Sequence, residues 1–230
     1  MLVWLLNISN KLNNLNLKFI LAISLMILSN CFEYEETIHF KKGFSGFVEV
    51  VYQVPVNPKT EKSFIKHLPI SQEDIESRLN KGFFNKNFKI KDYSVELIEK
   101  NPDDGNNLYI KKAKVSFKYE FTEPSHLDGV LIGQSFIKKK NNSIYVKREF
   151  KSILKALDQN SSAGEKKIYA ETQRLLGDGS IQFKVYFPIS SECRSSKGEV
   201  NLGSLNYRFP LLDTVEKPGI KTWDYQITIF

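Results

Sequence analysis

Cysteine is scarce in this sequence of 230 residues, which contains only Cys31 and Cys193. Two cysteines cannot form the set of disulfides that holds a small secreted miniprotein together. Proline and glycine are also few, at 8 and 12 residues, which excludes collagen-like and low-complexity chains. No apolar run reaches the roughly 18 residues that a membrane-spanning helix needs. Because 41% of the residues are hydrophobic, the chain instead has enough apolar material for one folded domain.

Sequence motifs for catalysis or metal binding are missing as well. The three histidines, His39, His67 and His126, are scattered without the spacing of a zinc site or of a His-based triad. The segment Gly43–Gly46 is a turn rather than a nucleophile elbow. Gly177–Ser180 lacks the Lys-Ser/Thr pair of a phosphate loop. We therefore expect no metal, no cofactor and no enzymatic activity.

The first thirty residues have the layout of a secretory signal peptide. Lys18 precedes a short apolar stretch, Phe19–Leu28, and a brief polar step leads to Cys31. The alternative is a buried core helix, which fits poorly because no polar face interrupts the stretch. The composition then changes abruptly, with acidic residues from Glu33 onward. The pattern predicts export, with residues 1–30 removed as the signal peptide.

The residues before Cys31 resemble a bacterial lipobox of the looser, spirochaetal type. Leu28 and Ser29 fit the common pattern, whereas Asn30 stands where Gly or Ala is usual. The resemblance implies cleavage just before Cys31, which would then carry a diacylglycerol and a further acyl chain such as palmitate. The mature chain, 31–230, would be anchored in the inner or outer membrane, on its periplasmic or cell-surface face. The alternative is an ordinary secreted protein in which the cysteine is incidental.

Alternation of apolar and polar residues is the strongest pattern in the rest of the chain. A period of two is typical of antiparallel sheets that place one face on a core. It predicts strands within 38–40, 48–54, 93–97, 108–121, 144–146, 181–187, 205–209 and 223–229. In the last of these, Trp223, Tyr225, Ile227 and Ile229 are expected to face the core, and Asp224, Gln226 and Thr228 to face water.

Helices are expected to be fewer and short. Ser71 fits the cap of a helix in which Ile75 and Leu79 share a face. Further helical segments are expected within 60–68, 124–131, 150–157 and 168–175. The sequence therefore predicts a single α+β domain over 31–230, a mainly antiparallel sheet with a few short helices packed on one face. The glutamate-rich residues 31–36 are expected to form a short acidic tether between the lipid and the fold.

Cys193 lies in a polar segment that is typical of an exposed loop. A nucleophilic role is one interpretation, supported only by the adjacent Arg194. An unpaired loop thiol is the other, and we favour it because no histidine lies nearby in sequence.

Lysines form the second charged feature of the chain. Lys112, Lys114 and Lys118 share one face of a predicted strand, and residues 138–140 are all lysine. Since export makes nucleic acid an unexpected partner, these lysines form either a solvated sheet face or a patch for anionic lipid head groups.

The order of the segments resembles the LppM-like family of bacterial membrane-anchored lipoproteins. A cysteine opens into a hairpin (34–40 and 47–54), a helical segment follows, and a long strand runs into Phe121-Thr122-Glu123-Pro124 and a short helix. A strand centred on Trp223 comes last. The resemblance implies a small α+β domain that binds lipid.

Two functions are compatible with these features. The first is a membrane-tethered, non-catalytic module that binds a lipid or another apolar ligand between sheet and helices. The second is an envelope or surface lipoprotein that acts through protein–protein contact, host molecules included. A sizeable apolar cavity would favour the first function, and a solid core with an exposed aromatic patch would favour the second.

Overall fold

The computed structural model describes residues 32–57, 60–63, 65, 68–81, 88–99, 111–128, 132–150, 179–211, 213 and 222–230. The predicted signal peptide, Cys31 and nearly all of the predicted helical segments 150–157 and 168–175 lie outside these residues. Residues Phe32–Phe230 form one compact unit. In the described ranges, no helix is long and apolar enough to cross a membrane.

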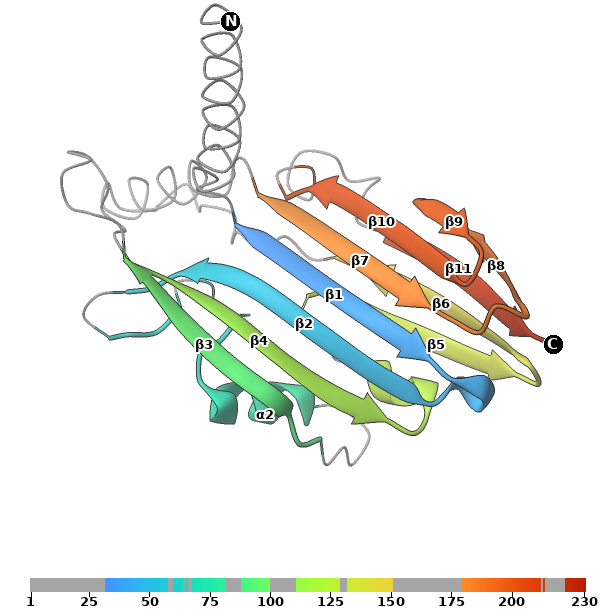
Figure 1. Cartoon of the computed structure of the whole chain (residues 1–230), viewed down its shortest axis with the longest axis horizontal. Helices are drawn as coiled ribbons and strands as arrows, with labels where there is room; N and C mark the ends of the chain where they lie inside the picture. The colour runs from blue at the N-terminus through green and yellow to red at the C-terminus, as the bar shows by residue number, and fades with distance from the viewer. Residues whose placement is uncertain are drawn as a thin grey trace, which may run out of the picture. The chain divides into compact units, whose positions relative to one another are not determined.

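Eleven strands in the described residues form two sheets (Figure 1). The strands of the large sheet are β1 (Glu33–Phe40), β2 (Gly46–Pro55), β3 (Lys91–Glu99), β4 (Lys111–Phe121), β7 (Ser180–Tyr186), β9 (Glu199–Asn201) and β10 (Ser204–Pro210). Those of the small sheet are β5 (Gln134–Lys140), β6 (Ser143–Glu149), β8 (Ser191–Ser195) and β11 (Thr222–Ile229). Their spatial orders are β3-β4-β2-β1-β7-β10-β9 and β5-β6-β11-β8. Among the described strands, β1 and β7 form the one parallel pair.

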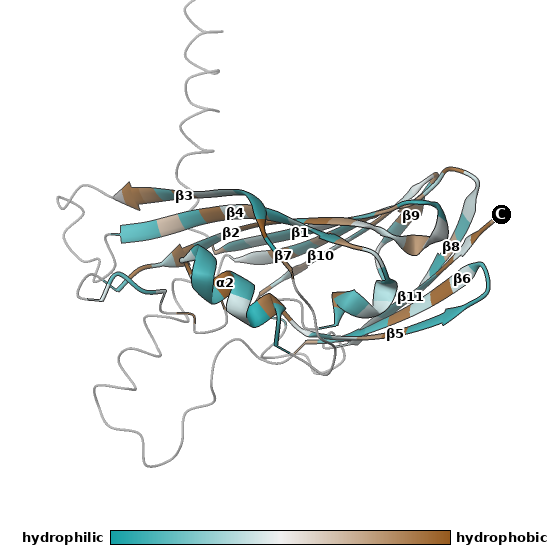
Figure 2. Cartoon of the chain, turned by 90° about the horizontal axis from the view of Figure 1, so that it is seen from below, coloured by the Kyte–Doolittle hydropathy of each residue, from teal (hydrophilic) through white to brown (hydrophobic). Residues whose placement is uncertain are grey.

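The small sheet packs on one face of the large sheet, so that the two form a sandwich (Figure 2). Trp223 of β11 lies against Phe183 of β7, with ring centroids 5.5 Å apart, and against Tyr207 of β10 at 5.1 Å. Every second residue of β11 is buried, starting at Trp223, and the residues between them are exposed or half-buried. This confirms the predicted inward and outward faces of the last strand.

One α-helix, α2 (Gln72–Leu79), lies in the described residues and packs on the same face of the large sheet (Figure 2). Ser71 caps it, because its hydroxyl accepts a hydrogen bond from the Asp74 amide (3.3 Å). Ile75 and Leu79 are buried as predicted. The loop before the helix is held by tyrosine hydroxyls of the sheet, which donate to the carbonyls of Pro69 and Ile70.

The predicted α+β class is wrong, because the protein is mostly β. Apart from α2, the described helical segments are two short 3-10 turns, η1 (Lys42–Phe44) and η2 (Pro124–Leu127). The helix expected over 124–131 ends early, since Asp128 already has an extended backbone with ψ of 131°. The second layer of the core is therefore a sheet, where the sequence had suggested helices.

The predicted acidic tether is also wrong for residues 33–36, which are part of strand β1. Phe32 is already buried, and β1 pairs with β2 on one side and β7 on the other. Glu36 has the same side-chain phase as the buried Tyr34 and Ile38, so it points into the core. The domain therefore begins one residue after Cys31.

The turn between β1 and β2 requires glycine at one position. A Cβ on Gly46 would lie 1.8 Å from the carbonyl oxygen of His39. No side chain fits there, which fixes where the hairpin closes.

Candidate functional site

The residues predicted from the sequence to carry the lipid, Cys31 with Leu28, Ser29 and Asn30, lie outside the described residues. The other cysteine is in an unexpected place. Cys193 is in β8, opposite Ile227 of β11, so the expectation of an exposed loop is wrong. Burial raises the pKa of its thiol to about 11. The thiol is therefore protonated at neutral pH and is a poor nucleophile.

The histidines do not form a cluster in the part of the chain that the structure describes. His39 lies on the polar face of β1, as expected, and His126 is on η2 with Phe88 at 5.8 Å. His67 is outside the described residues. No group of three or more His, Cys, Asp or Glu side chains that could hold a metal ion occurs among the described residues.

The interior of the sandwich is filled by aromatic rings. Phe183 lies at its centre, with Tyr34, Phe150, Phe209 and Trp223 around it at centroid distances from 5.3 to 6.2 Å. Two hollows lined by described residues lie at the surface. One, of about 700 Å³, lies beside α2 and is lined largely by polar residues such as Lys62 and Asp74. The other lies on the outer face of the large sheet.

A buried ion pair also crosses the interior. Arg148 of β6 and Glu36 of β1 are 1% and 0% exposed. The guanidinium donates two hydrogen bonds to the carboxylate (2.7 and 3.2 Å) and one to the carbonyl of Ile132 (2.9 Å). The hydroxyl of Tyr34 donates to the same carboxylate (2.8 Å). Burial alone would lower the pKa of Arg148, but Glu36 raises it above its ordinary value, so the guanidinium stays charged.

The sequence contained a signal for this pair that the strand patterns alone did not reveal. Glu36 falls on the apolar phase of β1 and Arg148 on the apolar phase of β6. Opposite charges at core-facing positions of two strands indicate a buried pair, since an unpaired charge there would be too costly.

The outer face of the large sheet is a grid of polar and aromatic side chains, nearly all exposed or half-buried. Strand pairing arranges these side chains in rows that run across the sheet, with neighbours about 5 Å apart. The first row contains Glu120, Phe47, His39, Tyr186 and Ser204. The second contains Lys118, Glu49, Thr37, Lys184 and Asn206.

The first row presents three stacked rings. His39 lies between Phe47 and Tyr186, at centroid distances of 4.3 and 4.8 Å and nearly parallel to both. Lys118 lies over the outer side of Phe47, with its ammonium 3.8 Å from the ring centroid. Partial burial lowers the pKa of His39, and the Glu49 carboxylate (3.7 Å) opposes this effect. At neutral pH the middle ring is therefore an uncharged imidazole.

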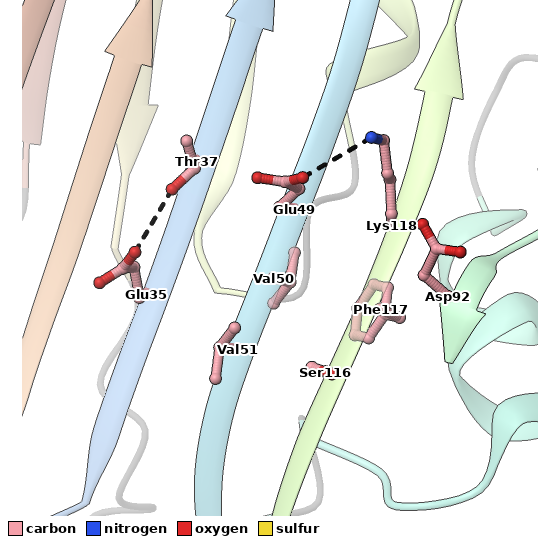
Figure 3. A pocket seen from close by; sticks show the side chains of 9 residues that line it. All are labelled: Glu35, Thr37, Glu49, Val50, Val51, Asp92, Ser116, Phe117 and Lys118. Carbon is pink, nitrogen blue, oxygen red and sulfur yellow. Dashed lines mark hydrogen bonds and ion pairs between the residues drawn. The ribbon is translucent and has the colours of Figure 1, made fainter. Parts of the chain in front are cut away.

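A hollow of about 210 Å³ lies along the second row, next to the stacked rings (Figure 3). Its polar rim is formed by Glu35, Thr37, Glu49, Asp92 and Lys118. A bulge in β3 between Lys91 and Ser94 brings Asp92 to this rim, with a backbone φ of 51°. The two glutamates are ion-paired, Glu35 with Lys184 (2.8 Å) and Glu49 with Lys118 (3.6 Å).

The lysines of β4 do not form a patch of one charge. Acidic side chains alternate with them on the same face, and Glu96 pairs in register with Lys114. Glu120 follows on the same strand and forms an ion pair with Lys91 (3.2 Å). Of the two alternatives for Lys112, Lys114 and Lys118, the structure therefore favours a solvated, charge-balanced sheet face.

The outer face offers hydrogen-bond donors, acceptors and ring faces. The Thr37 hydroxyl donates to the Glu35 carboxylate (3.5 Å), and Glu35 and Glu49 are ion-paired with lysines. These groups together can hold a polar surface through hydrogen bonds and ion pairs.

Comparison with known proteins gives a family and a distant structural likeness. No curated protein matches the sequence. A solved structure with similarity is the folded domain of the LppM protein of Mycobacterium tuberculosis, with 10% identity, a TM-score of 0.42, and coverage of 86% of this chain and 90% of that one. The sequence profile of the LIC11874-like family matches residues 26–230. Since this match spans the whole described domain, the chain belongs to the LIC11874-like family.

Proposed function

We propose that this protein is an exported lipoprotein, anchored through Cys31, whose sandwich is a non-catalytic module that binds another protein. The charged, apolar and lipobox segments in residues 18–31 support export and lipidation. Strand β1 begins two residues after Cys31, so the anchor would hold the sandwich directly at the membrane.

Two observations favour protein contact over an apolar ligand. Among the described residues, rings and the Arg148–Glu36 pair occupy the space around Phe183 between the two sheets, where an apolar ligand would otherwise lie. The observation that carries the proposal is the stacked row of His39, Phe47 and Tyr186 beside the polar hollow of the outer face. Aromatic rings with polar groups around them are typical of protein-binding surfaces.

The anchor is tested by labelling cells with a palmitate analogue. Wild-type protein should incorporate the label and partition with membranes, because two or three acyl chains anchor a protein firmly. Cys31→Ala should take up no label. Wild-type protein without label would refute the anchor.

The binding surface is tested by photo-crosslinking in intact cells. A photo-reactive amino acid at Tyr186, in the stacked row, should give a discrete crosslinked protein. Tyr145, a tyrosine of similar exposure on the outer face of the small sheet, is the matched control and should not. The crosslink at Tyr186 should disappear in a Phe47→Ser variant that still unfolds cooperatively. Equal crosslinking from both tyrosines would argue against this surface.

The apolar-ligand function predicts different results. Protein purified without detergent would contain extractable lipid, and a fluorescent fatty acid would shift the emission of Trp223. We expect neither, because Trp223 is surrounded by protein rings.

A further inference from the structure

Four turns of the sandwich lie at one end of the molecule (Figure 1). They are 41–45 between β1 and β2, 141–142 between β5 and β6, 187–190 between β7 and β8, and 202–203 between β9 and β10. Strand pairing places them together, because Tyr186 pairs with both His39 and Ser204 near the ends of these strands. The amide of Ile229 donates to the carbonyl of Asn142, and Lys139 donates to that of Gly43. We call these four segments the turn end.

The turn end exposes two large aliphatic side chains. Ile189 is 71% exposed and Leu202 is 80% exposed, on adjacent turns. The turns are in contact, since the Phe187 amide donates to the Gly203 carbonyl (3.0 Å) and a Cβ on Gly203 would lie 3.5 Å from the Ile189 side chain. Neither side chain contributes to the core, so packing does not explain them.

The charged side chains within the four turns are all lysines. The turns contain no acidic residue, whereas Lys41, Lys42 and the strand end Lys139–Lys140 are exposed there. Among the described residues, Lys41, Lys42 and Lys140 have no ion-pair partner. The nearest acid in sequence, Glu192, is paired with Arg194 (2.8 Å). Acidic Glu123 is on a fifth connection, after β4.

We propose that the turn end docks on an anionic lipid bilayer, with Ile189 and Leu202 inserted among the head groups and the lysines against lipid phosphates. Protruding aliphatic side chains beside unpaired lysines fit the boundary of an anionic bilayer, where apolar burial and electrostatic attraction act together. A protein partner is less well matched, because the apolar centre of a protein interface is flat and rich in aromatic residues.

The position of the turn end relative to the anchor indicates which bilayer it binds. This step rests on the proposed function, since it assumes the lipid anchor at Cys31. The anchor joins the domain at Glu33, the start of β1, and turn 41–45 follows the other end of that strand. Eight residues of strand at about 3.3 Å each separate the two points by roughly 26 Å. The turn end therefore lies at the opposite end of β1 from the anchor point, and the proposal is that the bilayer it binds is a second one.

Binding is tested by co-sedimentation of the compact unit, 32–230, with vesicles. Vesicles of phosphatidylcholine mixed with phosphatidylglycerol should bind it, and added salt should weaken binding by screening. Ile189→Ser with Leu202→Ser should weaken binding about tenfold or more. Lys41→Gln should weaken it about fivefold. Circular dichroism checks that each variant is folded.

Matched controls come from other surfaces. Val95→Ser with Leu97→Ser removes two exposed aliphatic side chains of edge strand β3, and Lys114→Gln removes a lysine of the outer face. Both should bind like the wild type. Absence of binding to anionic vesicles at low salt would overturn the proposal, as would equal losses in these controls. Capture of an acidic protein without any vesicle binding would also overturn it.

Binding to a second bilayer is tested with two sets of vesicles. Lipidated full-length protein is anchored in the first set, and the second set contains phosphatidylglycerol. Energy transfer between labelled vesicles should report bridging. The Ile189→Ser, Leu202→Ser variant should stay anchored but fail to bridge, and continued bridging would contradict the second-bilayer arrangement. If lipidation itself fails, bridging is lost for all variants while 32–230 still binds anionic vesicles, so the two failures are distinguishable.

Discussion

Arg148 and Glu36 introduce two full charges into a core that is otherwise mostly aromatic and aliphatic. The guanidinium carbon also lies 4.1 Å from the ring centroid of Phe183, so the pair is enclosed by the same rings that join the sheets. A buried pair of this kind adds little net stability, because desolvation offsets attraction. Its effect is to select the sheet alignment in which the two charges meet.

Removing one partner of the pair should therefore destabilise the domain far more than removing both. Arg148→Met should destabilise the domain by about 3–5 kcal/mol, because it leaves the Glu36 carboxylate buried and unpaired. Glu36→Leu combined with Arg148→Met should be less destabilised than Arg148→Met alone. Urea unfolding gives these values. Lys147→Met, one residue away with an outward ion pair to Glu149, is the control and should leave the urea unfolding midpoint nearly unchanged.

His39 should titrate below its ordinary pKa of about 6.5, because partial burial between two rings lowers it. Glu49→Gln should lower it further, since the carboxylate raises it. The contribution of the neutral ring to stability is then present above about pH 6.5 and is lost as pH falls through the folded-state pKa. NMR titration of the imidazole measures both effects. A pKa above that of an unfolded peptide would show that Glu49, rather than burial, dominates.

Edge strands account for the strands that the sequence patterns missed. β5 and β8 are the two edges of the small sheet, and β9 is one edge of the large sheet. Each has few buried residues, so the apolar alternation that identifies a half-buried strand is absent. The central strands β2, β4, β7 and β11 are regular because each has one face in the core, and all four were predicted.

Strand β11 is central in the small sheet, between β6 and β8, so removing it should severely destabilise the domain. A chain ending at Gly219 loses four buried side chains, each worth about 1.5–3 kcal/mol, against a typical stability of about 5–15 kcal/mol. We expect aggregation or degradation. Gln226→Ala, on the exposed face of the same strand, should be nearly silent. Blue-shifted emission from Trp223 in the intact domain is the accompanying spectroscopic expectation, and a cooperatively folding 31–219 chain would disprove this role of β11.

Residues 32–36 should be essential for folding because 33–36 belong to β1, whereas a tether would be dispensable. Deleting residues 32–36 removes half of a strand at the middle of the large sheet, including Glu36. The shortened chain should not fold, whereas a chain starting at Phe32 should unfold cooperatively on heating. A thermal melt of both chains decides the matter, since equal midpoints would mean that this segment is dispensable.

At the scale of the molecule, the sequence predicted a single domain, antiparallel pairing and the inward faces, but not the second layer. Alternation shows that one face of a strand is covered and does not show by what. The covering sheet is assembled from β5, β6, β8 and β11, and β11 is separated from β6 by more than seventy residues of sequence. The candidate surface was equally hidden, because His39, Phe47 and Tyr186 become neighbours only through strand pairing.

The parallel pairing of β1 with β7 also sets the order in which the domain can be completed. Glu33 and Ser180 are partners in that ladder although 147 positions separate them, so β1 has a free edge until most of the chain has been synthesised. Glu36 likewise has no ion-pair partner until Arg148, 112 positions later, has been synthesised. Contacts this distant in sequence make folding slow, on the order of milliseconds to seconds for β proteins. Stopped-flow refolding followed through Trp223 should show this delay, during which the unpaired edge of β1 stays open to pairing with other chains.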